Sequence, residues 1–110
     1  MKRRSEDIYL DDVRNPPGRG WHVIRCVALL KSMIVGLGVS NESYDIHLSL
    51  DHDLGEDEPT GYDFLNWLEA MIVAGSFKNL IFNFSVHSAN PVGRDNMRRA
   101  IDSIKRKHSC

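Results

Sequence analysis

The spacing of apolar residues changes along the chain, and this change predicts an alternation of strands and helices. Short runs rich in branched and aromatic residues indicate strands, whereas apolar residues three or four positions apart indicate helices. Strands are expected at 8–11, 21–26, 44–50 and 80–86. Helices are expected at about 27–37, from 60 to 75, and after Pro91. Such an alternation is typical of an α/β fold with a mostly parallel sheet, here with four strands and about three helices.

Two features depart from an ordinary α/β pattern. The segment 13–20 contains Pro16-Pro17-Gly18, so a loop replaces the helix expected between the first two strands. The strands at 44–50 and 80–86 alternate apolar and polar residues, whereas strands covered on both faces are usually apolar throughout. One sheet face is therefore expected to be semi-polar, covered by the final helix, by another subunit of a homo-oligomer, or by water.

Composition limits the class of protein. The chain has 110 residues, 42% of them hydrophobic and 26% charged, which predicts one globular domain over 1–110. A formal net charge of -1 excludes a polycation built for nucleic acid. Cys26 and Cys110 are too few for a disulfide framework, and no apolar run approaches the ~20 residues of a membrane span. We therefore expect a cytoplasmic protein without a membrane segment.

Acidic residues follow two of the predicted strands. Asp11 and Asp12 end the first strand, and Asp51 follows the third. Ligands of parallel sheets bind beyond the carboxyl ends of the strands. Divalent cations such as Mg²⁺ prefer carboxylate oxygens together with a substrate phosphate, so these three residues are candidate metal ligands. The alternative is a solvated acidic rim in which one aspartate caps a loop.

Two histidines lie at the same predicted edge. His52 follows Asp51, and His87 follows the fourth strand. Both are candidates for general acid or base, since imidazole titrates near neutral pH. Asp53 would orient an imidazole or share the metal, unless it caps the turn, and Ser88 is the hydroxyl beside His87. A single histidine at such a position is more often structural.

Candidate phosphate ligands surround this edge. The segment "HSANPVGRDNM" places Asn90, Gly93, Arg94 and Asn96 at the start of the final helix, whose N–H groups suit an anion. Arg14 lies in the loop after the first strand, and its guanidinium matches phosphate geometry. Alternatively, Arg14 pairs with a neighbouring aspartate, and Asn90 only shapes the turn before the helix.

Four stretches resemble the cyclic-phosphate processing receiver-like domain. They are "LDDVRNPP", "SLDHDLG", "GYDFLNWL" and "HSANPVGRDNM", and the resemblance covers about residues 8–101. It implies a receiver-like, flavodoxin-like sheet that lacks the first helix and the fifth strand with its lysine. It also implies a bacterial or phage protein that acts on the cyclic phosphate of an RNA end or a nucleotide.

The leading hypothesis is hydrolysis of that cyclic phosphate. The three aspartates would hold a divalent cation, the arginines would bind phosphate oxygens, and the two histidines would move protons. One alternative is a non-catalytic binder that sequesters a cyclic nucleotide signal. Another is a degenerate receiver phosphorylated at Asp51, although the missing lysine argues against it.

Overall fold

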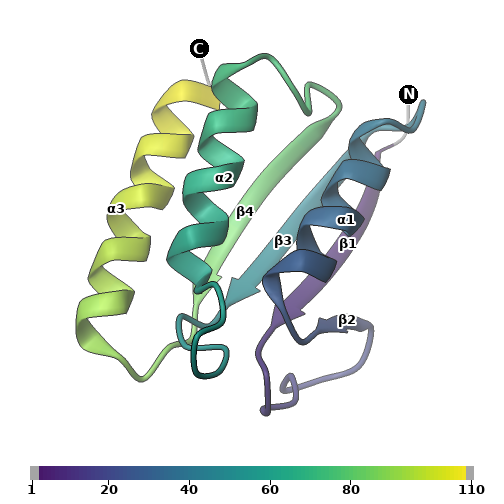
Figure 1. Ribbon diagram of the computed structural model, residues 1–110. Helices are drawn as coiled ribbons and strands as arrows, with labels where there is room; N and C mark the ends of the chain where they lie inside the picture. Colours follow the sequence, from purple (N-terminus) through teal and green to yellow (C-terminus); the bar gives the residue numbers. More distant parts are fainter. Residues whose placement is uncertain (1–2, 109–110) are drawn as a thin grey trace.

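The computed structural model describes residues 3–108, which form one sheet and one layer of helices (Figure 1). The strands are β1 (Arg4–Leu10), β2 (Trp21–Ile24), β3 (Tyr44–Leu50) and β4 (Leu80–Val86). The helices are α1 (Val27–Gly38), α2 (Gly61–Val73) and α3 (Pro91–His108). All strand pairs are parallel, so the predicted receiver-like α/β fold is confirmed. Cys110 lies outside the described residues.

The boundaries of β1 and β2 differ from the prediction, and β1 ends at Leu10 rather than at 11. β1 begins at Arg4, four residues before the predicted start at Ile8. Its polar first half pairs with β3 from Arg4 opposite Tyr44 onward, so backbone hydrogen bonding extends the strand where the side chains carry no apolar signal. β2 ends at Ile24 rather than at 26.

The strand order is β2-β1-β3-β4, which places β1 and β3 in the middle of the sheet. From β1 the chain continues to β2 on one side of β1, and from β2 it crosses to β3 on the other side. The topological switch point, where ligands of such sheets bind, therefore lies between the ends of β1 and β3. Pairing continues beyond these ends, since the N–H of Asp51 donates to Leu10 O at 3.0 Å and that of His87 to Leu50 O at 3.0 Å. This backbone register aligns the residues predicted for the site along one edge.

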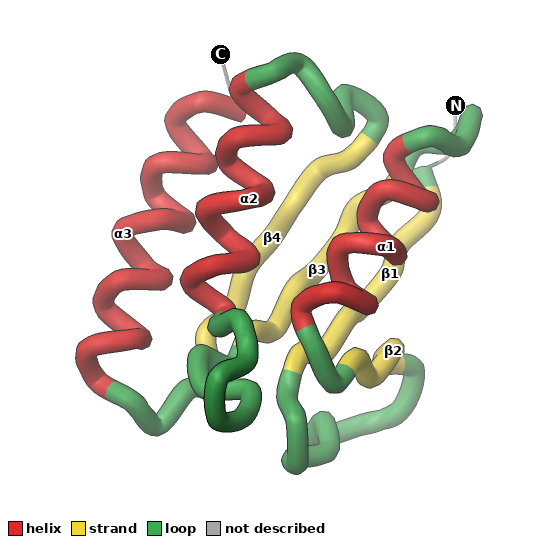
Figure 2. Tube along the Cα trace, in the orientation of Figure 1, coloured by secondary structure: helices red, strands yellow, loops and turns green. Residues whose placement is uncertain are grey.

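The helices all cover the same face of the sheet (Figure 2). Ile8, Leu48 and Leu50 point into this layer and are fully buried, and one apolar cluster joins them to α1, α2 and α3. Within residues 3–108, no helix covers the opposite face, because residues 11–20 form a loop and α3 packs beside α2. We call this uncovered side the open face. The final helix therefore does not cover the semi-polar side, which was one of the predicted alternatives.

The start of α2 supports the end of β3. Thr60 and Asp63 form the predicted capping box, in which Thr60 Oγ1 accepts the Asp63 N–H at 3.1 Å and Asp63 Oδ2 accepts the Thr60 N–H at 2.9 Å. Gly61 packs so tightly that a Cβ there would lie 2.2 Å from the carbonyl oxygen of Asp51. This glycine therefore lets the helix approach the residue that ends the strand. None of the helices within 3–108 is long and apolar enough to cross a bilayer.

Candidate functional site

Three carboxylates meet at the ends of β1 and β3, and we call them the acid cluster. Asp11, Asp12 and Asp51 each offer one oxygen, and these oxygens lie within 4.8 Å of one another. Asp11 is fully buried and Asp51 is only 8% exposed. Three oxygen donors at this spacing suit a hard divalent cation.

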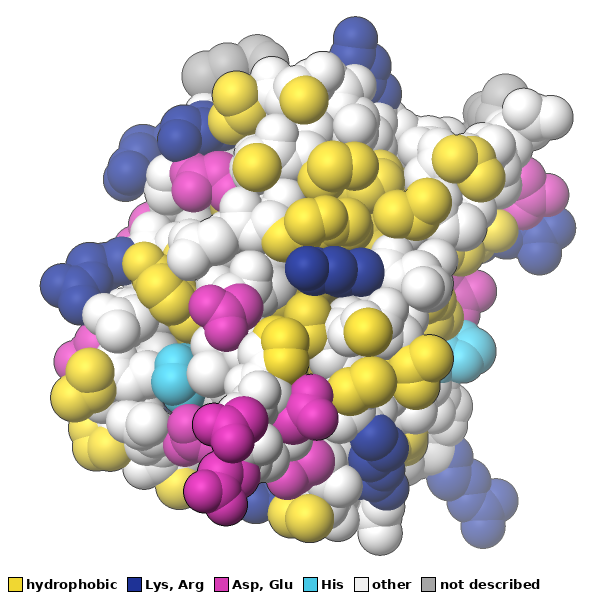
Figure 3. Space-filling view, in the orientation of Figure 1, with side chains coloured by type: hydrophobic (Ala, Val, Ile, Leu, Met, Phe, Trp, Pro, Cys, Tyr) yellow, Lys and Arg dark blue, Asp and Glu magenta, His cyan; other side chains and the backbone are white. Residues whose placement is uncertain are grey.

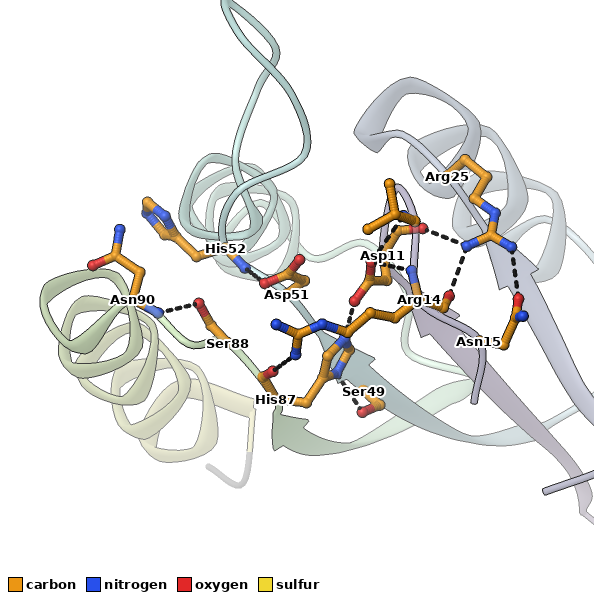
Figure 4. Close-up of polar contacts among 11 residues, drawn as sticks. Asp11, Arg14, Asn15, Arg25, Ser49, Asp51, His52, His87, Ser88 and Asn90 are labelled. Carbon is orange, nitrogen blue, oxygen red and sulfur yellow. Dashed lines mark hydrogen bonds and ion pairs between the residues drawn. The ribbon is translucent and has the colours of Figure 1, made fainter. Parts of the chain in front are cut away.

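Asp11 is held by a dense set of hydrogen bonds. Its Oδ1 accepts the N–H groups of Arg14 at 2.8 Å and Val13 at 3.0 Å, and its Oδ2 lies 3.1 Å from Nε2 of His87 (Figure 4). Burial opposes ionisation, but these donors outweigh it and lower the pKa of Asp11. The carboxylate is therefore negatively charged and fixed in orientation.

Asp51 is in the opposite situation. Burial and the negative charge of Asp11 raise its pKa, although its Oδ1 accepts the His52 N–H at 2.8 Å. Two neighbouring carboxylates with opposite pKa shifts show that the negative charge of the acid cluster is incompletely compensated by the protein. The donor chemistry and this excess negative charge both fit a divalent cation.

His87 is fixed at both ring nitrogens. Nδ1 lies 2.8 Å from Oγ of Ser49, and Nε2 faces Asp11. The ring also stacks on Tyr9, with centroids 4.3 Å apart and planes 5° from parallel. His87 therefore orients Asp11, much as partner groups around a metal site orient its ligands. Ser49 and Tyr9 were not predicted; their only sequence signal is that both alternate with core residues of their strands.

A second group lies at the start of α3, and we call it the helix-cap cluster. His52 Nδ1 lies 2.8 Å from Oδ1 of Asp53, whose Oδ2 accepts the Asn90 side-chain amide at 3.2 Å. These two partners lower the pKa of Asp53. Asn90 Oδ1 accepts the Gly93 N–H at 3.1 Å, and buried Ser88 accepts the Asn90 N–H at 3.1 Å. The cluster therefore ties the end of β3 to the first turn of α3.

The His52 ring points toward Asn90 and away from the acid cluster (Figure 4). Its side chain is 16% exposed, and Nε2 has no hydrogen-bond partner among residues 3–108. Gly93 permits this position, because a Cβ there would lie 2.4 Å from Cγ of His52. The two predicted histidines therefore lie on opposite sides of Asp51, one fixed at both nitrogens and one with a free nitrogen.

The predicted arginines separate into two environments. Arg14 donates to the carbonyl oxygen of His87 at 3.2 Å, which places it beside the acid cluster. Arg94 makes no side-chain hydrogen bond within 3–108, and its Nε is buried. Asn96 accepts a hydrogen bond from Arg99 at 2.6 Å. The structure thus brings Arg14 to the acid cluster but joins neither Arg94 nor Asn96 to either cluster.

Arg25 was not predicted, and it shapes the loop at this edge. Its guanidinium donates to the carbonyl oxygens of Asp11 at 3.2 Å and Arg14 at 2.7 Å, and to Oδ1 of Asn15 at 3.0 Å (Figure 4). The sequence offers one indication of this role, since Arg25 directly follows β2 at the same sheet edge as the acids.

Exposed acids extend the negative charge beyond the site. Figure 3 shows Asp and Glu side chains gathered at the end of the molecule where the loop between β3 and α2 lies. Asp53, Glu56, Asp57 and Glu58 of this loop are exposed. A cation is therefore attracted to this end of the molecule before it reaches the buried carboxylates.

The parallel sheet with carboxylates at the switch point defines the class as a receiver-like domain. The chain belongs to the family of cyclic-phosphate processing receiver domains, whose model matches residues 6–103. The predicted resemblance is thereby confirmed, and a cyclic phosphate is the substrate that the family implies. Comparison with curated proteins and with solved structures gives no significant match.

Proposed function

We propose that the chain hydrolyses a cyclic phosphate ester of a nucleotide or RNA end at the edge between β3 and α3. The observation that carries this proposal is the acid cluster, whose three carboxylate oxygens lie within 4.8 Å of one another, with the pKa of buried Asp11 lowered and that of Asp51 raised. Such a site is incomplete without a cation and favours a ligand that brings one, as a phosphate ester does.

Asp11, Asp12 and Asp51 are the residues that would hold a divalent cation such as Mg²⁺. When bound, the cation supplies Lewis-acid polarisation of a phosphoryl oxygen. Arg14 adds a guanidinium beside the cluster, and the first turn of the 18-residue α3 adds the positive end of a helix dipole. The phosphate would therefore lie between the acid cluster and the helix-cap cluster.

Proton transfer is assigned to His52. In hydrolysis, the oxygen of water bonds to phosphorus, one ribose oxygen leaves, and the proton lost by water ends on that oxygen to give a monoester. His52 Nε2 is free to carry this proton, while Asp53 holds the other ring nitrogen at 2.8 Å. His87 is assigned to positioning Asp11, because both of its nitrogens are occupied.

The test is product analysis with defined substrates. The protein is incubated with 2′,3′-cyclic AMP and with an RNA ending in a 2′,3′-cyclic phosphate, in Mg²⁺ or in a chelator, and the monoester is followed by phosphorus NMR. Turnover in Mg²⁺ is expected, with loss in the chelator and a decrease of about 10² to 10⁴ in kcat for His52→Gln. His22→Gln is the matched control, because His22 pairs with Glu6 on β1, away from the site, at 2.6 Å.

Other outcomes would contradict hydrolysis in distinct ways. Tight binding with the ligand recovered intact would favour a sequestering protein. Labelling by a small phosphodonor that is lost in Asp51→Asn would favour a degenerate receiver.

A further inference from the structure

The open face of the sheet carries a connected row of aromatic rings. Trp21 meets Tyr9 edge to face with centroids 5.8 Å apart, and it lies against His47 at 5.3 Å. Tyr9 in turn stacks on His87, the residue that orients Asp11. The row therefore runs from the middle of the open face to the acid cluster.

The row is close enough to the acid cluster for one ligand to reach both. Tyr9 precedes Asp11 by two residues, about 7 Å along a strand, and Trp21 pairs with Asp7, about 13 Å before Asp11. The separation of about 7 to 13 Å between these rings and Asp11 matches the length of a single nucleotide.

The rest of the open face suits a neutral polar ligand. Asn83 and Ser85 are exposed on β4. Ser85 Oγ lies 2.8 Å from Nε2 of His47, whereas the amide of Asn83 has no hydrogen-bond partner within residues 3–108. The outward strand positions carry the carboxylates of Asp7 and Asp45 and no Lys or Arg, and Arg3, directly before β1, is ion-paired with Asp45 at 2.7 Å. Because Arg3 is engaged by Asp45, these strand positions offer a polyanionic strand no unpaired cation, whereas an uncharged nucleobase would stack on the partly exposed rings and bond to the amide of Asn83.

We propose that the open face, through Trp21 and His47 with the buried Tyr9 supporting Trp21, binds the nucleobase of a single cyclic nucleotide whose phosphate lies at the acid cluster. This inference rests on the proposed function for the position of the phosphate. It narrows the ligand class from a nucleotide or RNA end to a single cyclic nucleotide whose base contacts the protein.

Tryptophan fluorescence tests the proposal directly. The chain has two tryptophans, and Trp67 packs in the helix layer against Phe64 and Phe77, so Trp67→Phe leaves Trp21 as the only reporter. Rapid mixing with 2′,3′-cyclic AMP in Mg²⁺, recorded before turnover, is expected to quench Trp21 in a saturable way. Glycerol 1,2-cyclic phosphate, which has no base, is expected to leave the signal unchanged.

Affinity measurements provide the second arm. Trp21→Ala is expected to weaken cyclic AMP binding about tenfold or more and to leave binding of the glycerol ester unchanged. Asn83→Asp covers the case in which Trp21→Ala does not fold: it is exposed and isosteric, and its added charge should weaken cyclic AMP binding several-fold. Trp67→Phe is the matched control and should bind both ligands like the natural chain. An RNA with the same cyclic end should bind no more tightly than the mononucleotide.

The inference and the proposed function fail separately. If the glycerol ester is hydrolysed, but Trp21 is not quenched by cyclic AMP and neither variant changes its affinity, the nucleobase site is wrong and the hydrolase stands. If cyclic AMP quenches Trp21 and Trp21→Ala abolishes this binding without any turnover, the nucleobase site stands and hydrolysis is wrong. Tighter binding of the RNA would overturn the restriction to a single nucleotide.

Discussion

Asp51→Asn is expected to stabilise the metal-free protein while it abolishes divalent-cation binding. In the natural chain, Asp51 is buried beside the ionised Asp11, and both burial and that charge raise its pKa. Asparagine has the same shape, and its Oδ1 can still accept the His52 N–H that Asp51 accepts at 2.8 Å. The substitution therefore removes the repulsion and leaves the packing intact.

The size of the effect follows from the spacing of the oxygens. Two unit charges 4.8 Å apart repel by about 3 kcal/mol at an effective dielectric constant of about 20, and by about 1 kcal/mol in bulk water. Arg14 and His87 offset part of the repulsion. We therefore expect the free energy of unfolding to rise by about 1 to 3 kcal/mol, or a Tm increase of about 4 °C or more for a domain of this size.

The assay is urea and thermal unfolding of both proteins in chelator and in increasing Mg²⁺. The natural chain should gain stability with Mg²⁺ by mass action, whereas Asp51→Asn should gain none, so the two curves cross. Because the folded-state pKa of Asp51 is raised, protonation relieves its cost in acid. The stability difference should thus be full at neutral pH and shrink as the pH falls through the raised pKa. A less stable Asp51→Asn in chelator at neutral pH would refute this reasoning.

Three further predictions address the groups around the acid cluster. His87→Ala should weaken Mg²⁺ binding about 10- to 100-fold in calorimetry, since Asp11 loses the partner that orients it; unchanged affinity would contradict a positioning role. Gly93→Ala should reduce turnover about as much as His52→Gln, because the new methyl displaces the His52 ring, while the helix gains up to about 1 kcal/mol; full activity would show that the ring position is unimportant. Gly61→Ala should lower the free energy of unfolding by about 1 to 3 kcal/mol, because the new methyl group would collide with the carbonyl oxygen of Asp51. Equal stability of the two proteins in urea would contradict this tight contact.

The local pattern was sufficient to predict the element order and the edge that carries the chemistry. Strands and helices differ in the period of their apolar residues, and each period is visible within a short window. The acids of "LDD" and "SLDHDLG" end apolar runs, which places them at strand ends. Because the strands are parallel, these ends lie at the same edge of the sheet. The capping box at Thr60 and the missing helix in 13–20 were likewise local signals. The polar first half of β1 gave no such signal, because backbone pairing forms it.

Only the tertiary structure decided how the side chains group. Both histidines follow strands, but their surroundings differ. The two ring nitrogens of His87 face Ser49 and Asp11, which are far apart in sequence. His52 instead turns toward α3, where Gly93 leaves room for its ring. Arg94 and Arg14 were equal candidates by residue type, and helix packing separated them. The open face shows the same division. The alternation along β3 and β4 predicted that one sheet face is semi-polar. Whether a helix covers that face depends on where α3 packs, and α3 packs beside α2. Contacts between distant segments depend on the whole chain, and no local period encodes them.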